Sequence, residues 1–330
     1  MLSYIIRRLL QMAVTLFIIS IISFVISALS PTDPYAAQLD PKKTATDLER
    51  QRDQEGFDDP IAKKYVLFYK RFFSDLGAVI SGNEDHVWQL TSLKTRAPVL
   101  PTMWSKMLVS LPLFIVTTLI VWTMSFPVGI YSALRRNSFQ DRLITIGSYA
   151  LIALPGFWLS LEVIKFFTAR GIPIISPETL GVDLTGMRAF MDATWHMGVP
   201  GIIGGLGGIA VLTRYVKGSM LEVMGQDYIR TAKAKGLTAD AVTYKHALRN
   251  ASLPFVTMIA GLLPGIFGGS IVFEAIYNWP GLGRWIFEAT FTKDLYVVVT
   301  ALFVSSALTL LGILISDILY TVADPRVRLS

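Results

Sequence analysis

Few side chains in this sequence could carry out chemistry, and none stands in a recognisable catalytic arrangement. The chain has no cysteine and three histidines, which excludes a thiolate metal site, a disulfide framework and a cysteine nucleophile. No HExxH, GxSxG or GxxxxGK(S/T) motif is present, so the sequence predicts no zinc hydrolase site, no serine nucleophile and no phosphate-binding loop. We therefore predict no catalytic residue, no metal site and no cofactor bound by this chain itself.

Four charged side chains interrupt otherwise apolar stretches, namely Glu162, Lys165, Glu274 and Asp317. A lone carboxylate at the bilayer centre costs on the order of 2.5–3.5 kcal/mol, so each should be paired, lie near an interface or line a wet cavity. Glu162 and Lys165 stand three residues apart and are expected to neutralise each other. The others lie near span ends, unlike the midplane ion sites of secondary transporters. The sequence thus predicts a pathway without an energy source of its own, in which these four residues serve the pathway or the structure.

Composition places the chain in a membrane. Hydrophobic residues make up 52% of it and charged residues 16%, with a mean hydropathy of +0.52. Soluble domains carry about 25% charged residues, so we exclude a soluble enzyme, and the same numbers exclude a disordered chain. A membrane-spanning helix needs roughly 20 apolar residues. The predicted spans are Leu9–Leu29, Met107–Tyr131, Leu143–Phe167, Met197–Thr213, Pro254–Tyr277 and Leu295–Val322.

The first and fourth predicted spans need separate arguments. The first is interpreted as a retained span and not a cleaved secretory signal, because its apolar run exceeds the roughly 7–15 residues of a signal core. The fourth is the weakest prediction, because glycine lowers its hydropathy. Its glycine run GIIGGLGG at 201–208 is interpreted as a set of small residues that lets neighbouring helices approach closely.

The formal charge of +6 is unevenly distributed along the chain. Bases exceed acids in the segments on the side of the N-terminus, whereas the segments on the other side are nearly balanced. The positive-inside rule therefore predicts a multi-pass membrane protein with both termini in the cytoplasm. Anionic lipid headgroups account for the basic inner surface, so it does not indicate nucleic-acid binding.

The spans divide the chain into three parts. Residues 1–30 form the cytoplasmic start and the first span, residues 31–106 an external loop, and residues 107–330 a core of five spans. Within the core, Arg214–Leu253 is predicted to be a cytoplasmic loop.

The external loop contains one predicted helix. Asp59 followed by Pro60 is typical of a helix start, and Gly77 is predicted to end the helix. The helix could be a cap that packs on its own spans or a docking surface for an external partner, and both interpretations remain open. Its exposed surface is expected to carry Lys63, Lys64 and Lys70.

The cytoplasmic loop is predicted to contain two short helices. Met220–Lys235 is compatible with a helix, Gly236 is a turn, and Thr238 is the predicted N-cap of a helix that continues through Arg249. The second helix could lie on lipid headgroups or be recognised by a cytoplasmic protein. The small side chains of Ala232 and Ala234 favour the second interpretation, because they would let a partner approach closely.

Several segments resemble the membrane subunits of ABC importers of the oligopeptide/dipeptide class, and the resemblance covers nearly the whole chain. The most specific are SMLEVMGQDYIRTAKAKGLTADAVTYKHALRN at 219–250 and the turn NWPGLGRW at 278–285. YIIRRLL at 4–10, PTDP at 31–34, the external stretch DDPIAKKYVLFYKRFFSDLG at 58–77 and DPRVRL at 324–329 are similar to other parts of that family.

The resemblance implies an all-α integral membrane protein with six transmembrane helices, the type I ABC importer permease fold and a long external loop after the first helix. The implied partners are a homologous six-helix permease subunit, two ATPase subunits that bind ATP and Mg²⁺, and an external solute-binding protein. The chain itself would not be an enzyme.

The resemblance also implies two contact surfaces. Arg230–Gly236 occupies the place of the importer EAA…G motif, with Arg230 where an acid is usual and Thr231 where the first alanine is usual, which puts in doubt any salt bridge from that acid. At the N-terminal exit, Thr32 stands where glycine is usual. The residues expected to couple to the ATPase are Asp227, Arg230, Thr231, Ala232, Lys233, Ala234, Lys235, Gly236, His246 and Arg249. Those expected to dock the binding protein are Lys63, Lys64, Lys70, Asn278, Trp279, Pro280, Gly281 and Arg284.

The function that follows is the permease subunit of an ATP-driven importer, with peptides as the default substrate. The alternatives are the same architecture for a nickel chelate, an oligosaccharide, an opine-like or a glutathione-like compound, or a membrane assembly module without a transport path.

Overall fold

The computed structural model describes residues 2–29, 59–83, 85–179, 185–268 and 271–323. The predicted exit motif at 31–34, the rest of the external stretch up to residue 58 and the C-terminal motif at 324–329 lie outside the described residues. The described residues are helical, apart from connecting segments and one isolated bridge between Thr91 and Pro98.

Four long helices form the frame, and each is long and apolar enough to cross a bilayer. They are α1 (Leu2–Ala28), α4 (Val99–Leu134), α7 (Met187–Met224) and α14 (Leu295–Ala323). They contain the first, second, fourth and sixth predicted spans. α1 packs along α14, and α4 along α7.

α7 is much longer than the predicted fourth span, so Arg214, the predicted start of the cytoplasmic loop, lies inside this helix. The added residues at both ends carry charges, among them Asp192 and Glu222, so a search for apolar runs left them out. The glycine run 201–208 lies in the middle of the helix. A Cβ atom at Gly205 would stand 3.1 Å from Val121 Cγ2 of α4, and one at Gly208 would stand 3.2 Å from the same atom. The run therefore brings two helices into close contact, as the sequence predicted.

The third predicted span is not one straight helix. It divides into α5 (Phe139–Ala153) and α6 (Gly156–Thr168), which meet at 90°. Pro155 has no N–H to donate, and it favours an extended conformation at Leu154, whose φ of −82° and ψ of 123° are those of extended chain. The predicted span over 143–167 is therefore present only if the bent pair crosses the membrane as one broken span.

The fifth predicted span is broken into short pieces. They are α10 (Leu253–Met258), a 3₁₀ turn (Ile259–Gly261), α11 (Leu262–Gly268) and α12 (Ile271–Ile276). Gly261, Pro264 and Gly265 weaken a continuous helix here. The described residues thus supply four crossings, or five if the bent pair is one span, against the six predicted. α11 packs between α4 and α14, so protein surrounds part of the broken backbone.

The external helix, α3 (Ile61–Ser81), begins and ends later than predicted. Pro60 is its N-cap, and Asp59 forms an ion pair with Lys63 at 2.9 Å and does not cap the helix. Gly77 lies inside the helix. Gly82 ends it, because this residue adopts a φ of 64° that glycine reaches without strain.

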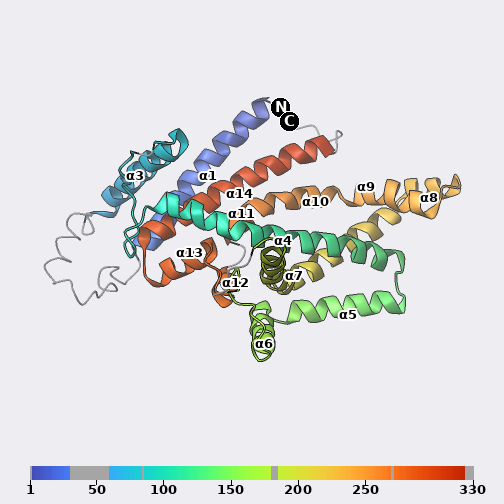
Figure 1. Ribbon diagram of the computed structural model, residues 1–330. Coiled ribbons are helices and arrows are strands. Elements are labelled where there is room, and N and C mark those ends of the chain that lie inside the picture. The colour runs from blue at the N-terminus through green and yellow to red at the C-terminus, as the bar shows by residue number, and fades with distance from the viewer. Residues whose placement is uncertain (1, 30–58, 84, 180–184, 269–270, 324–330) are drawn as a thin grey trace.

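The helices define two ends of the molecule. At one end, Arg8 of α1 forms an ion pair with Asp317 of α14 at 2.9 Å, and Ser316 donates to the carbonyl of Thr257 at 3.4 Å. At the other end, Ser92 donates to Asp294 at 2.6 Å. Figure 1 shows α3 and α13 (Leu282–Phe291) at the opposite end from α8 (Asp227–Ala234).

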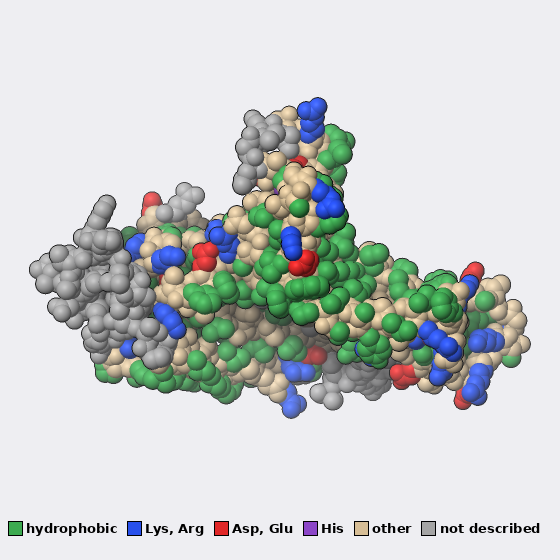
Figure 2. All heavy atoms as spheres, turned by 90° about the horizontal axis from the view of Figure 1, so that it is seen from below, with side chains coloured by type: hydrophobic (Ala, Val, Ile, Leu, Met, Phe, Trp, Pro, Cys, Tyr) green, Lys and Arg blue, Asp and Glu red, His purple; other side chains and the backbone are tan. Residues whose placement is uncertain are grey.

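Each end has its own apolar core. Phe24, Phe68, Phe72, Leu282 and Val297 belong to the cluster that joins α1, α3, α13 and α14. The second cluster joins α4 and α7 to the segment that follows α7. Figure 2 shows hydrophobic surface between the two ends and Lys and Arg side chains gathered near the α8 end.

Candidate functional site

The segment from Gly225 to Ser252 follows α7 and is named the inner tip after the side of the membrane predicted for it. Met220–Lys235 is not a single helix, contrary to the prediction, because α7 ends at Met224 and α8 begins at Asp227. Gly236 adopts a φ of +77° and turns the chain, as predicted. The amide of Ala241 donates to Thr238 Oγ1 at 3.3 Å, which agrees with the predicted N-cap. A π-helical turn (Ala241–Ala247) and α9 (Leu248–Ala251) complete the tip.

A compact apolar core fixes the tip to the spans. Ile229 of α8 and Val242 of the π-helical turn are buried against Val216 and Met220 of α7 and Ile130 of α4. Because these side chains form one close-packed cluster, a force applied at α8 is transmitted to α4 and α7.

Ala232 belongs to this core and is only 7% exposed. The prediction that Ala232 offers a flat surface to a partner is therefore wrong, since its small side chain serves packing within the tip. Ala234 is exposed and remains available.

The surface of the tip is cationic. The exposed residues of the predicted coupling set are Asp227, Arg230, Thr231, Lys233, Ala234, Lys235, Gly236 and Arg249, while His246 is half-buried. Asp227 and Arg230 form an ion pair at 3.4 Å. Because bases outnumber the single acid of this set, the exposed face of α8 would suit an acidic partner surface.

The opposite end of the molecule, named the outer end after its predicted side, is organised around Glu274, a carboxylate that is 1% exposed. It accepts a hydrogen bond from Ser110 Oγ at 2.7 Å and one from the amide of Arg284 at 2.9 Å. Ser110 Oγ in turn accepts from the amide of Leu282 at 2.8 Å. A Cβ atom at Gly281 would stand 2.6 Å from Glu274 Oε2, so the chain approaches the carboxylate at a point where only glycine fits. Glu274 therefore holds the start of α13 against α4.

The NWPGLGR turn serves this arrangement more than an external contact. Trp279 is 3% exposed and donates from Nε1 to the carbonyl of Val109 at 3.0 Å, and Gly281 is also buried. The prediction that these two residues dock a partner is therefore wrong. Asn278 and Pro280 are exposed, and half-buried Arg284 forms an ion pair with Glu288 at 2.8 Å.

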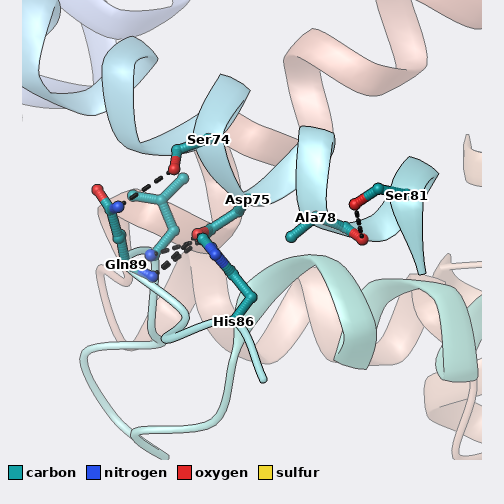
Figure 3. A network of polar contacts seen from close by, with 7 residues as sticks. Ser74, Asp75, Ala78, Ser81, His86 and Gln89 are labelled. Carbon is teal, nitrogen blue, oxygen red and sulfur yellow. Dashed lines mark hydrogen bonds and ion pairs between the residues drawn. The ribbon is translucent and has the colours of Figure 1, made fainter. Parts of the chain in front are cut away.

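Asp75 of α3 is a second buried carboxylate, and no pattern in the sequence singled it out. It is 1% exposed and accepts from the amide of Leu90 at 2.8 Å, with His86 Nε2 at 2.8 Å from the other oxygen. Figure 3 shows Asp75 on α3, with the His86 ring and the backbone amide of Gln89 beside it from the loop beyond the helix, while the Gln89 side chain reaches Ser74. This loop is thereby tied to α3. Lys63 and Lys70 lie on the exposed side of the helix, and Lys64 is half-buried.

The other three of the four predicted span charges, Glu162, Lys165 and Asp317, also have partners. Lys165 Nζ lies 3.9 Å from Glu162 Oε2 on a largely exposed surface of α6. Asp317 accepts from Tyr4 at 2.9 Å in addition to its ion pair with Arg8.

Asp141 of α5 is a charge whose role sequence reasoning missed. It is buried, accepts from Ser132 of α4 and forms an ion pair with Lys217 of α7. It therefore ties three helices together at the inner end.

Comparison with known proteins identifies the family. The family model of the binding-protein-dependent transport system inner membrane component matches residues 125–329, and the model of the N-terminal part of such membrane components matches residues 1–114. The chain belongs to this family. The first match covers the inner tip, Glu274 and the NWPGLGR turn, and the second covers α1 and α3.

Members of this family with assigned names match over their full length. The oligopeptide transport system permease protein AppB of Bacillus subtilis (strain 168) is 35% identical over 330 residues, which cover 99% of this chain and 100% of the relative. The dipeptide transport system permease protein DppB of Alkalihalophilus pseudofirmus is 32% identical, covering 99% and 100%. The glutathione transport system permease protein GsiC of Escherichia coli (strain K12) is 32% identical and covers 99% of each chain.

Proposed function

We propose that the chain is the permease subunit of an ATP-driven, binding-protein-dependent importer of peptides in the bacterial inner membrane. The observation that carries this proposal is similarity over the full length to permease proteins named for oligopeptide and dipeptide transport. A homologous second permease would complete the pathway, and two ATPase subunits would bind ATP and Mg²⁺, since this sequence has no phosphate loop.

The inner tip supports a mechanism for coupling. An ATPase subunit that seats the exposed face of α8 would move the tip as a unit, because Ile229 and Ala232 are buried in its core. The same core includes side chains of α4 and α7, so the movement would reach the spans. The helices of the chain would pack differently in the two states of the pathway, open to the outside and open to the inside. The chain would carry out no covalent chemistry.

The orientation we propose places both termini and the inner tip in the cytoplasm. Its support is that Asp317 and the basic tip lie toward one end of the helices, with the excess of Lys and Arg expected of a cytoplasmic face.

Reconstitution tests the function. The chain, its partner permease and the two ATPase subunits in proteoliposomes should take up radiolabelled tri-alanine only when binding protein is present outside and ATP inside. Uptake that is unaffected by the ATPase subunits would contradict the proposal.

A glutathione-like substrate is the second candidate, because one relative is named for glutathione transport. The same proteoliposomes distinguish the two. A peptide importer should take up tri-alanine in preference to glutathione, whereas the reverse preference would favour the second candidate.

We further propose that the exposed Lys63 and Lys70 of α3, with Asn278 and Pro280, form part of the surface that receives the binding protein. Deleting α3 would not test this, because Phe68 and Phe72 belong to the apolar cluster that joins α1, α3, α13 and α14, and the deletion would disrupt that cluster. Exposed ion pairs contribute about 0.2–1 kcal/mol each. The variant Lys63→Glu/Lys70→Glu should therefore raise the binding-protein concentration at half-maximal uptake by about twofold to thirtyfold, at a nearly unchanged melting temperature. An unchanged half-maximal concentration would show that α3 is only a cap.

A further inference from the structure

A cavity of about 630 Å³ opens beside the inner half of α7. Its walls come from three elements: Arg214 and Glu222 of α7, Ile152 near the end of α5, and Phe255 and Met258 of α10. A volume of this size is within the range of roughly 300–1,000 Å³ that small-molecule sites occupy.

The cavity combines apolar walls with two opposite charges. Arg214 and Glu222 form no ion pair with any residue that the structure describes. The guanidinium of Arg214 lies 4.3 Å from the ring centroid of Tyr149, which limits the positions that this long side chain adopts. Charges of both signs in one cavity would be costly against hydrocarbon, so this surface faces water or a polar ligand.

The spacing of the two charges limits the ligand. Arg214 and Glu222 are eight residues apart on one helix, so their Cα atoms are separated by about 12 Å along its axis. An extended tripeptide spans about 10 Å. A free tripeptide carries a carboxylate at one end and an ammonium at the other, which complements this pair. An anionic phospholipid headgroup complements it less well, because it has a phosphate for Arg214 but no cation for Glu222.

We propose that this cavity binds a free tripeptide, with the terminal carboxylate at Arg214 and the terminal ammonium at Glu222. The proposal rests on the proposed function and adds to it a peptide site at the inner mouth of the pathway, where a peptide stays before it enters the cytoplasm. Phe255 and Met258 receive the aliphatic side chains of the peptide.

The position of the site links it to the inner tip. Ser219, which also lines the cavity, donates to the carbonyl of Ala251 at 2.7 Å, and Phe255 belongs to the core of the tip. A peptide in the cavity therefore contacts α7 just before the tip and α10 just after it.

Equilibrium binding of radiolabelled peptides to the complete complex in nanodiscs, without binding protein, tests the site. The probes are tri-alanine, tri-alanine amide and N-acetyl-tri-alanine. Each capped probe lacks one of the two terminal charges and so loses one charge-assisted hydrogen bond in the cavity. Each capped probe should therefore bind the wild-type complex about tenfold more weakly than tri-alanine.

The variants assign each peptide end to its residue. Arg214→Gln should weaken tri-alanine binding about tenfold but leave the binding of tri-alanine amide unchanged, because the amide has already lost the interaction that the variant removes. Glu222→Gln should likewise weaken tri-alanine binding about tenfold but leave the binding of N-acetyl-tri-alanine unchanged, because that probe already lacks the ammonium. The matched control is Arg188→Gln, which removes an exposed charge at the opposite end of α7 and should bind all three probes as the wild type does.

Equal binding of free and capped peptides by the wild type, or equal losses for all probes in Arg214→Gln, would overturn the proposal. So would loss of co-purified anionic phospholipid from Arg214→Gln with no effect on tri-alanine, since Arg214 would then hold a lipid phosphate. Uptake in proteoliposomes separates this from the proposed function. If the wild type imports tri-alanine without these binding differences, only the inner site is wrong, whereas failure to import any peptide would refute the function itself.

Discussion

Gly236→Val is expected to uncouple ATP hydrolysis from peptide uptake. Gly236 has a φ of +77°, a conformation that a β-branched residue adopts only under strain. A Cβ atom there would meet nothing within 4 Å, so the effect comes from the backbone and not from a clash. Strain of about 1–3 kcal/mol corresponds to a factor of roughly 5 to 150 in an equilibrium. The stimulation of ATPase activity by substrate and the rate of uptake in proteoliposomes should therefore both decrease by a factor in that range.

Two control variants separate the shape of the turn from its charge. Gly236→Asn should retain most of the activity, because asparagine tolerates the left-handed conformation better than other residues with a side chain. Lys233→Ala removes one exposed charge, worth under ~1 kcal/mol, and should be nearly silent. Normal coupling in Gly236→Val together with a severe defect in Lys233→Ala would show that charge, and not the turn, carries the coupling.

Glu274→Ala is expected to destabilise the outer end and abolish uptake. The substitution leaves the hydroxyl of Ser110 and the amide of Arg284 without the acceptor that they now share, and each unsatisfied buried group costs about 1–3 kcal/mol. Together with the cavity left behind, the free energy of unfolding should fall by about 3–5 kcal/mol. The measurements are the melting temperature of the purified complex and its yield.

The control for Glu274 lies one helix away. Glu288 pairs with Arg284 at 2.8 Å on the surface, so Glu288→Gln should lower the melting temperature little. Glu274→Gln keeps the shape of the side chain and one oxygen acceptor. Its melting temperature should therefore lie between those of Glu274→Ala and Glu288→Gln. Equal melting temperatures for Glu274→Ala and Glu288→Gln would contradict the structural role of the buried carboxylate.

The long spans were predictable because an uninterrupted apolar run of about 20 residues is typical of a membrane-spanning helix. The regions of α1, α4 and α14 follow directly from such runs. Hydropathy failed where proline and glycine decide the path of the chain. Pro155 bends the third span by 90°, and the region 253–276 breaks into short helices, although hydropathy alone describes both as spans.

Residues that contact a partner are a second feature that the sequence pattern alone does not identify. A small residue such as Ala232 can serve a partner or the packing of its own segment, and the sequence pattern is the same for both. The same holds for Trp279, whose indole is buried against α4. Gly236 was predictable, because a turn between two helical segments requires a residue that accepts a positive φ.

The hydrogen-bond partners of the buried polar groups could not be predicted, because the partners lie far apart in the sequence. Ser110 and Glu274 are 164 residues apart, and no local pattern connects them. Arg214 and Glu222 were predicted only as charges of the cytoplasmic loop, and the cavity between α7 and α10 forms only when the chain is folded.

Whether the inner tip contacts an ATPase subunit is tested most directly by cysteine cross-linking in the assembled complex. The chain has no cysteine, so a single substitution places the only thiol of this subunit. Lys235→Cys, at the end of α8, should cross-link to an ATPase subunit, and the yield should change when ATP binds. Ser81→Cys, at the end of α3, should form no such cross-link and should react with a membrane-impermeant thiol reagent from outside. A cross-link from Ser81→Cys to the ATPase, with none from Lys235→Cys, would contradict both the coupling surface and the orientation.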